Sequence, residues 1–255
     1  MKIKNFKKLK NGKYKLEFDN KEKLITYDNV ILENNLLFNS SIDEDLLNKI
    51  NKENNYYDVY NKVLKMVGTK LRSEKEIKDF LIKNGLSDND LDKIITNLKN
   101  QKIIDDIKYT KAYIHDKIAF TNYGPNKIRN ELLNYVDPSI IDEELELIEQ
   151  SIFDEKVKKF ILKKVNLNHK YSNAILKKKI TDELYNLGFT NFNVDEFLIE
   201  DDSIIKKECL KLYEKLSKKY TGKELIIKLT QKLYQKGFSR ESINEEIDKL
   251  NVSYE

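Results

Sequence analysis

The feature that most constrains this chain is an imperfect repeat of about fifty residues, which begins near Tyr57. In each copy an apolar-periodic helix is followed by a polar segment that opens another helix, and in three of the four copies the first of these helices ends at or near a glycine. Four such helices correspond, at residues 77–86, 128–136, 180–189 and 229–238. Units of this size pack on their neighbours in series. The pattern therefore predicts a mostly α-helical chain of tandem three-helix repeats in an elongated, curved array.

Helix-capping signals recur with the same period and support the repeat. Ser73 and Glu76 have the spacing of a capping box at the start of a second helix. Gly124 and Pro125 break the chain before the second helix of the next copy, and Pro138 suits the first turn of its third helix. Residues 193–196 have the pattern of the third helix of the third copy. The predicted repeats are 57–105, 106–150, 151–201 and 202–255.

Residues 1–40 have a different pattern. Residues 13–18 alternate polar and apolar, residues 22–27 are a second strand candidate, and the apolar residues 30–32 suggest a third. Asn11 and Gly12 suit a tight hairpin because both tolerate positive φ. Since an isolated hairpin is only marginally stable, we expect a small antiparallel sheet that packs on the helices.

A connecting helix is expected over residues 41–56, between the sheet and the repeats. Ser40 and Ser41 offer its cap, and acidic residues follow in its first turn. The polar segment 52–55 favours a hinge at its end.

The composition excludes several classes of protein. No apolar run approaches the roughly twenty residues that span a bilayer, and the first residues lack the apolar core of a signal peptide. The single cysteine, Cys209, allows no internal disulfide, and its helical spacing predicts a buried thiol. We therefore expect a cytoplasmic protein with no membrane partner.

The basic residues are the strongest candidates for contact with a partner. The net charge of +4 argues only weakly for nucleic acid, and arginine occurs at three positions in a lysine-rich chain. Basic side chains near helix termini form anion sites, and arginine adds a planar fork that lysine lacks. The predicted contacts are Lys70, Arg72, Lys108, Lys111, Lys117, Lys127 and Arg129. Lys218, Lys219 and Lys223 extend a possible basic track, although a solvated surface is the simpler explanation for any single lysine.

No constellation of residues indicates catalysis. The chain has no phosphate-binding glycine loop, no cysteine pair and no His-Glu-x-x-His motif. His115 and His169 are isolated. Asp105 and Asp106 lack further oxygen ligands at a recognisable spacing, and a helix cap with a first-turn acid explains them better than a metal. We predict a non-enzymatic protein without metal or cofactor.

Three segments, in order, resemble the RecX family of RecA regulators. Residues 72–77 resemble the family's Arg-Ser-Glu-x-Glu-Leu motif, and residues 103–113 resemble a junction in which Asp-Asp leads to an aromatic residue, here Tyr109. Residues 124–132 resemble Gly-Pro-x-Arg-Ile-x-x-Glu-Leu. The strands and the third and fourth copies resemble longer members from low-GC Gram-positive bacteria. The motif residues with structural roles would be Ser73, Glu76, Asp105, Asp106, Tyr109, Gly124 and Pro125.

This chain departs from the family pattern at three places. Thr110 stands where the family usually has alanine, and Lys127 stands where arginine is common. The second copy also lacks the glycine after its second helix and has Tyr135 and Val136 there.

The resemblance implies a non-catalytic modulator of the RecA recombinase filament on DNA. Such proteins limit the ATPase, strand-exchange and coprotease activities of the filament, and so act in DNA recombination, DNA repair and the SOS response. We expect a monomer that binds RecA and, in addition, single- or double-stranded DNA. Two alternatives remain: a DNA-binding protein whose three-helix units contact the phosphate backbone as winged-helix-like domains do, and a scaffold for other proteins.

Overall fold

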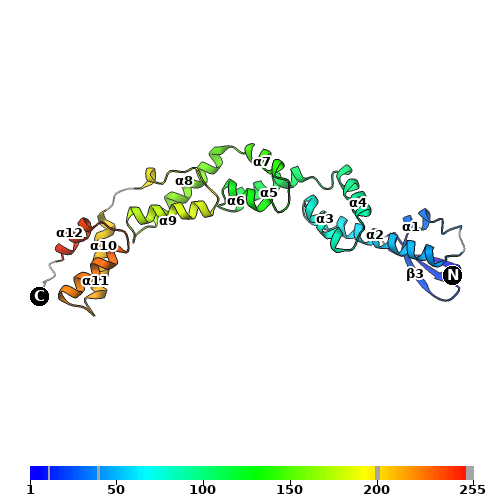
Figure 1. Cartoon of the computed structure of the whole chain (residues 1–255), viewed down its shortest axis with the longest axis horizontal. Helices are drawn as coiled ribbons and strands as arrows, with labels where there is room; N and C mark the ends of the chain where they lie inside the picture. Colours follow the sequence, from blue (N-terminus) through cyan, green and yellow to red (C-terminus); the bar gives the residue numbers. More distant parts are fainter. Residues whose placement is uncertain (11, 39–40, 199–201, 251–255) are drawn as a thin grey trace. The chain divides into compact units, whose positions relative to one another are not determined.

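The computed structural model describes residues 1–10, 12–38, 41–198 and 202–250 (Figure 1). The chain divides into two compact units, one of Met1–Thr110 with Tyr135–Ile140 and the other of Lys111–Asn134 with Ile141–Glu255. The described residues are mostly α-helical, with one small antiparallel sheet near the N-terminus, as the sequence predicts. Among them, no helix has the length and apolar character needed to cross a membrane.

The sheet has three strands in the order β1-β2-β3, which are Ile3–Lys8, Lys13–Phe18 and Lys23–Tyr27. The second and third match the predicted strands. The sequence pattern did not indicate β1, because a bulge between Ile3 and Asn5 breaks the two-residue alternation and lysines occupy most of its exposed positions.

One face of the sheet packs on helices. Leu16 and Phe18 are buried against Val30 and Ile31 of helix α1 (Asp28–Glu33) and against Ile50 of helix α2 (Glu44–Thr69). The strand predicted at residues 30–32 is therefore wrong. A short apolar run has no period that separates a strand from a buried helix.

Helix α2 runs unbroken for 26 residues from the sheet into the first repeat (Figure 1). The hinge expected at residues 52–55 is wrong, because those polar residues bind the sheet: Asn54 Nδ2 donates to Ile25 O at 3.1 Å and Thr26 Oγ1 donates to Asn54 Oδ1 at 2.8 Å. The helix cap is Asp43, whose side chain accepts from Leu46 N. Ser40, one of the expected capping serines, lies outside the described residues.

The first repeat is formed by the end of α2, α3 (Glu74–Lys83) and α4 (Asp88–Asn100). Its core holds Val63, Ile77, Leu81, Ile94 and Leu98, which recur at helical spacing and are almost wholly buried. This core belongs to the first unit.

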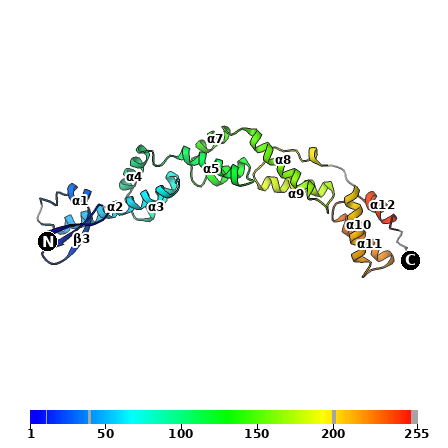
Figure 2. The same ribbon diagram turned by 180° about the vertical axis from the view of Figure 1, so that it is seen from behind.

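The remaining helices follow the predicted period, with one departure. They are α5 (Asp106–Phe120), α6 (Pro125–Leu132), α7 (Pro138–Glu146), α8 (Gln150–Asn166), α9 (Asn173–Asn186), α10 (Asp202–Leu216), α11 (Gly222–Tyr234) and α12 (Arg240–Asp248). Helices α8 and α9 lie side by side, and α10, α11 and α12 pack together (Figures 1 and 2). The repeat boundaries and the curvature of the array stay predictions.

The third repeat lacks the predicted third helix in its described residues. A single 3₁₀ turn, Asp195–Phe197, stands in its place. Asn193 Oδ1 accepts from Asp195 N at 3.1 Å, and such local side-chain bonds compete with helix formation.

Two glycines bring α6 and α9 together in the second unit. Gly124 N donates to Leu187 O at 2.6 Å and Asn126 N donates to Gly188 O at 3.2 Å. A Cβ atom on Gly124 would lie 2.7 Å from the Gly188 carbonyl, and Gly188 itself has a φ of +88°. The start of α6, the second helix of the second repeat, therefore contacts the glycine turn at the end of α9, the second helix of the third repeat.

The same arrangement recurs between α9 and α11. Ser172, the N-cap of α9, donates its backbone N–H to Lys236 O at 3.0 Å. Gly237 has a φ of +83°, and a Cβ atom there would lie 2.5 Å from Ser172 Oγ. We call these two contacts the glycine junctions.

The first unit joins its helices differently. At the start of α3, the N–H of Glu74, one residue after the N-cap Ser73, binds the side chain of Asp106 at 2.8 Å. Tyr135, which stands where the other repeats have glycine, packs its ring 6.2 Å from that of Tyr109. We call the hydrogen bond between Glu74 N and Asp106 the aspartate junction. It accounts for the missing glycine.

Candidate functional site

Five of the seven basic residues predicted to contact a partner pair with acidic residues of this chain. The nitrogen–oxygen distances are 2.8 Å for Arg72–Glu76, 3.8 Å for Lys108–Asp105, 3.6 Å for Lys111–Glu144, 2.6 Å for Lys117–Glu131 and 2.6 Å for Arg129–Asp142. Lys70, at the end of α2, is exposed and forms no ion pair with any described residue. The set is therefore dispersed over two units and largely neutralised.

Arg72 supports the start of α3. Ser73 Oγ accepts from Glu76 N at 3.2 Å while Glu76 Oε2 accepts from Ser73 N at 3.0 Å, which completes the predicted capping box. The Arg72 guanidinium binds the other oxygen of Glu76. Since both side chains are mostly buried, this arginine orients the cap.

Two acidic residues shape the aspartate junction. Glu74 pairs with Lys78 and Lys99, and these lysines lower the pKa of its carboxyl although burial acts in the opposite direction. Burial raises the pKa of Asp106, which accepts from Glu74 N. Asp105 Oδ1 accepts from Lys108 N at 3.0 Å and caps α5, which matches the cap interpretation of this acidic pair.

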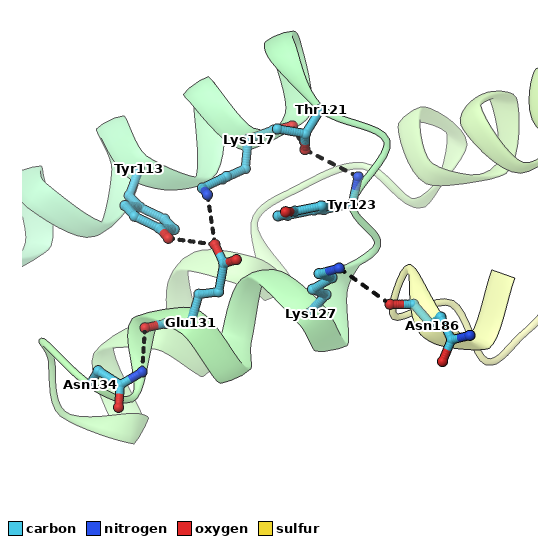
Figure 3. A network of polar contacts seen from close by, with 8 residues as sticks. All are labelled: Tyr113, Lys117, Thr121, Tyr123, Lys127, Glu131, Asn134 and Asn186. Carbon is cyan, nitrogen blue, oxygen red and sulfur yellow. Dashed lines mark hydrogen bonds and ion pairs between the residues drawn. The ribbon is translucent and has the colours of Figure 1, made fainter. Parts of the chain in front are cut away.

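Lys117 and Lys127 belong to one lysine–tyrosine cluster between α5 and α6 (Figure 3). Lys117 Nζ lies 5.0 Å from the Tyr113 ring centre and 5.1 Å from that of Tyr123. Lys127 Nζ lies 4.2 Å from the Tyr123 ring centre and donates to Asn186 O at 3.5 Å. Glu131 accepts from Tyr113 Oη at 2.6 Å and pairs with Lys117. The cluster fixes both lysines by cation–π contacts.

The electrostatics of this cluster favour its charged form. The hydrogen bond with Lys117 lowers the pKa of Glu131, and the same bond raises the pKa of Lys117. Burial, with the bond to Glu131, raises the pKa of Tyr113 to about 12. The phenol thus stays protonated and the ion pair persists at neutral pH.

Arg129 is held in a two-pronged pair between α6 and α7. Its Nε and Nη2 donate to the two oxygens of Asp142 at 2.6 Å and 3.0 Å. This bond raises the pKa of Arg129 and lowers that of Asp142. The two side chains remain 35% and 46% exposed, so this is a surface pair that a partner can reach.

The sequence pattern predicts no role for Tyr113, Tyr123 or Glu131, although Tyr113 and Glu131 lie within the segments that resemble the family. One signal could have indicated the cluster: Tyr113 and Lys117 are four residues apart and share a helix face. The other contacts join separate helices, so no local spacing reveals them.

The other motif residues have structural positions. Tyr109 is buried, Gly124 is the N-cap of α6, and Pro125 begins that helix. Cys209 is buried, as predicted, and burial raises its pKa to about 11, so the thiolate is scarce at neutral pH. Among the described residues, no group of three or more His, Cys, Asp and Glu side chains could hold a metal ion.

Fold and surface together define a mostly α-helical protein with a small N-terminal sheet, whose motif residues shape helix junctions. The chain is 30% identical to the regulatory protein RecX of Streptococcus sanguinis (strain SK36) over 232 residues, which cover 87% of this chain and 89% of the relative. It is 31% identical to regulatory protein RecX of Finegoldia magna over 188 residues, 71% of this chain and 90% of that one. No protein-family model matches it.

Two crystal structures have the same fold. One, of regulatory protein RecX, aligns with a TM-score of 0.64 at 24% identity, over 74% of this chain and 94% of the other. The second, of RecX from Lactobacillus salivarius, gives 0.53 at 24% identity over 61% and 97%. This chain belongs to the RecX family of regulatory proteins.

Proposed function

We propose that this protein is a non-enzymatic regulator that binds the RecA–DNA filament and limits its ATPase, strand-exchange and coprotease activities. The observation that carries the proposal is the match to regulatory proteins along nearly the whole of both chains. The role places the protein in the cytoplasm, in DNA recombination, DNA repair and the SOS response, and it needs neither metal nor cofactor.

The surface chemistry suits a filament as partner. Several weak contacts together give strong binding to a polymer, because the first contact raises the effective concentration of the remaining sites. Lys70 and Arg129 are accessible candidates for such contacts, because Lys70 is exposed and the ion pair of Arg129 is exposed and costs little to exchange. Lys111 is also exposed, but its partner Glu144 is nearly buried, so this pair is costlier to exchange. Arg72 and Lys117 are less suited, since the capping box and the tyrosine cluster hold them.

The direct test is the DNA-dependent ATPase rate of RecA, measured with the protein at ratios below one per RecA protomer. We expect strong inhibition at these ratios. An unchanged rate at every ratio, with the added protein shown to be folded by circular dichroism, would contradict the proposal.

A further inference from the structure

The first 27 residues of this protein carry a marked excess of positive charge. That segment holds nine lysines and three acidic residues, a net charge of +6, whereas the whole chain carries +4, so residues 28–255 carry −2. Residues 156–181 are a second basic stretch, with nine lysines and no acidic residue. There Lys159, Lys164 and Lys177 form ion pairs with Glu155, Glu183 and Asp195.

The segment folds into the three-stranded sheet, and the strand register determines where its lysines lie. Leu16 pairs with Phe6 on one side and Leu24 on the other, and this row faces the buried core. Because side chains alternate across a strand, the next row, Lys7, Lys15 and Ile25, faces away from it. Lys23 lies on the same outer face, opposite Glu17.

Most of these lysines have no acidic partner. Lys15 pairs with Glu17 at 2.8 Å and Lys13 with Asp58 at 2.7 Å. Lys4, Lys7, Lys8, Lys10 and Lys23 are exposed, and none forms an ion pair with any residue that the structure describes. We call these five residues the sheet lysines. They contrast with the candidates on the helices, most of which are neutralised.

The basic surface continues onto α2 within the same unit. A surface depression beside the sheet is lined by Lys13, Tyr27 and Asp58 and, on the next turns of α2, by Lys62 and Lys65. Lys13 Nζ lies 4.7 Å from the Tyr27 ring centre, and both side chains bind Asp58. One acid thus stands among three lysines, so the depression is also net positive.

We propose that the N-terminal sheet, through Lys7 and Lys23 of its outer face and the other sheet lysines along and just after the edge strand β1, is a binding surface for the phosphate backbone of nucleic acid. Closely spaced unpaired lysines match the charge of a polyphosphate chain and gain affinity by releasing its counterions. The face carries few groups that could read bases, so binding is independent of sequence. The inference concerns bare nucleic acid and holds whether or not the protein regulates RecA.

Edge-strand lysines have another known role, which is to prevent β1 from pairing with a strand of another molecule. That role explains charge on β1 and also on β3, because these are the two edge strands of the sheet. It does not explain the continuation of the positive surface onto α2.

The test is the salt dependence of binding, by fluorescence anisotropy, of the full chain to labelled 30-nucleotide poly(dT) and to a 30-base-pair duplex. Replacement of Lys7, Lys10 and Lys23 by Gln removes three sheet lysines. The slope of log K against log salt should become shallower by about 2 for the single strand and by about 2.7 for the duplex. Affinity at about 0.1 M salt should fall roughly tenfold or more.

The matched control replaces Lys218, Lys219 and Lys223 by Gln, an equal loss of charge at exposed positions of the fourth repeat. We expect it to bind like the wild type. Equal losses in the two variants would show that net charge or a track along the helices drives binding, and would overturn the proposal. So would an unchanged slope in the sheet variant with its melting temperature intact. Loss with only one of the two probes would support the surface and identify the strand form that it binds.

Discussion

The glycine junctions of the second unit and the aspartate junction of the first solve one packing problem in two ways. Each must satisfy a backbone N–H at the start of a second helix, where the helix supplies no acceptor. Gly124 and Ser172 meet a carbonyl of a glycine turn, whereas Glu74 meets the carboxylate of Asp106. This difference indicates that the glycine turns at Gly188 and Gly237 are required by close contact between backbones. Where the glycine is absent, the charged side chain of Asp106 replaces the backbone acceptor.

The largest effect is expected for Gly188→Ala. The change places a side chain at a φ of +88° and inside contact distance of the Lys127 backbone, so we expect a loss of about 3 kcal/mol in the free energy of unfolding. Urea denaturation measures it. Gly85→Ala is the matched control, since Gly85 has a φ of +72° but no neighbour within 4 Å. It should lose only about 1 kcal/mol, from backbone strain. Equal losses would contradict the role of contact.

Asp106→Ala should have a smaller effect on the aspartate junction. Removal of the acceptor leaves Glu74 N without its bond, which costs about 1 kcal/mol. Asp106→Asn keeps an oxygen acceptor of the same shape and should restore most of this loss in the same denaturation measurement. If Asn is as destabilising as Ala, the hydrogen bond is not what joins the helices.

The two kinds of junction should also differ in their response to acid. Because Lys78 and Lys99 lower the pKa of Glu74, its ionised form stabilises the folded chain above the ordinary glutamate value of about 4.3. That contribution is lost as the pH falls through the lowered pKa. Unfolding free energies between about pH 7 and pH 3 should therefore converge for wild type and Glu74→Gln, from a difference of at most about 1 kcal/mol. A difference that persists in acid would contradict the ion-pair account.

Arg129→Ala should change stability least, because its pair with Asp142 is exposed. Its melting temperature should stay close to that of the wild type, while its affinity for the RecA filament, measured by co-sedimentation, should fall. Lys159→Ala is a suitable control, since Lys159 also forms an exposed ion pair, with Glu155. A large drop in melting temperature for Arg129→Ala would instead give this arginine a structural role.

Much of the helical part could be predicted from the sequence, because its signals are local. The capping box of Ser73 and Glu76, the proline at the start of α6 and the apolar periods each depend on residues within a few turns. The failures have equally physical causes. Apolar residues 30–32 suit a strand or a helix, and the polar residues at 52–55 looked like a hinge because their partner, the sheet, is distant in sequence.

The candidate site was harder to predict because its residues act across helices. Arg72 lies in a segment that carries the resemblance and Lys117 lies on a predicted helix, but in the structure they bind Glu76 and the tyrosine cluster. Composition suggested a weak basic character for the whole chain, and only the strand register shows where unpaired lysines gather.

Amide hydrogen exchange tests most directly whether the aspartate junction and the glycine junctions are independent of one another. It would be measured at Glu74 and at Gly124 and Asn126, in Asp106→Ala and in Gly188→Ala. We expect each variant to lose protection at one junction only: Asp106→Ala exposes Glu74 N and leaves Gly124 and Asn126 protected, and Gly188→Ala does the reverse. Joint loss at all three amides in either variant would contradict it.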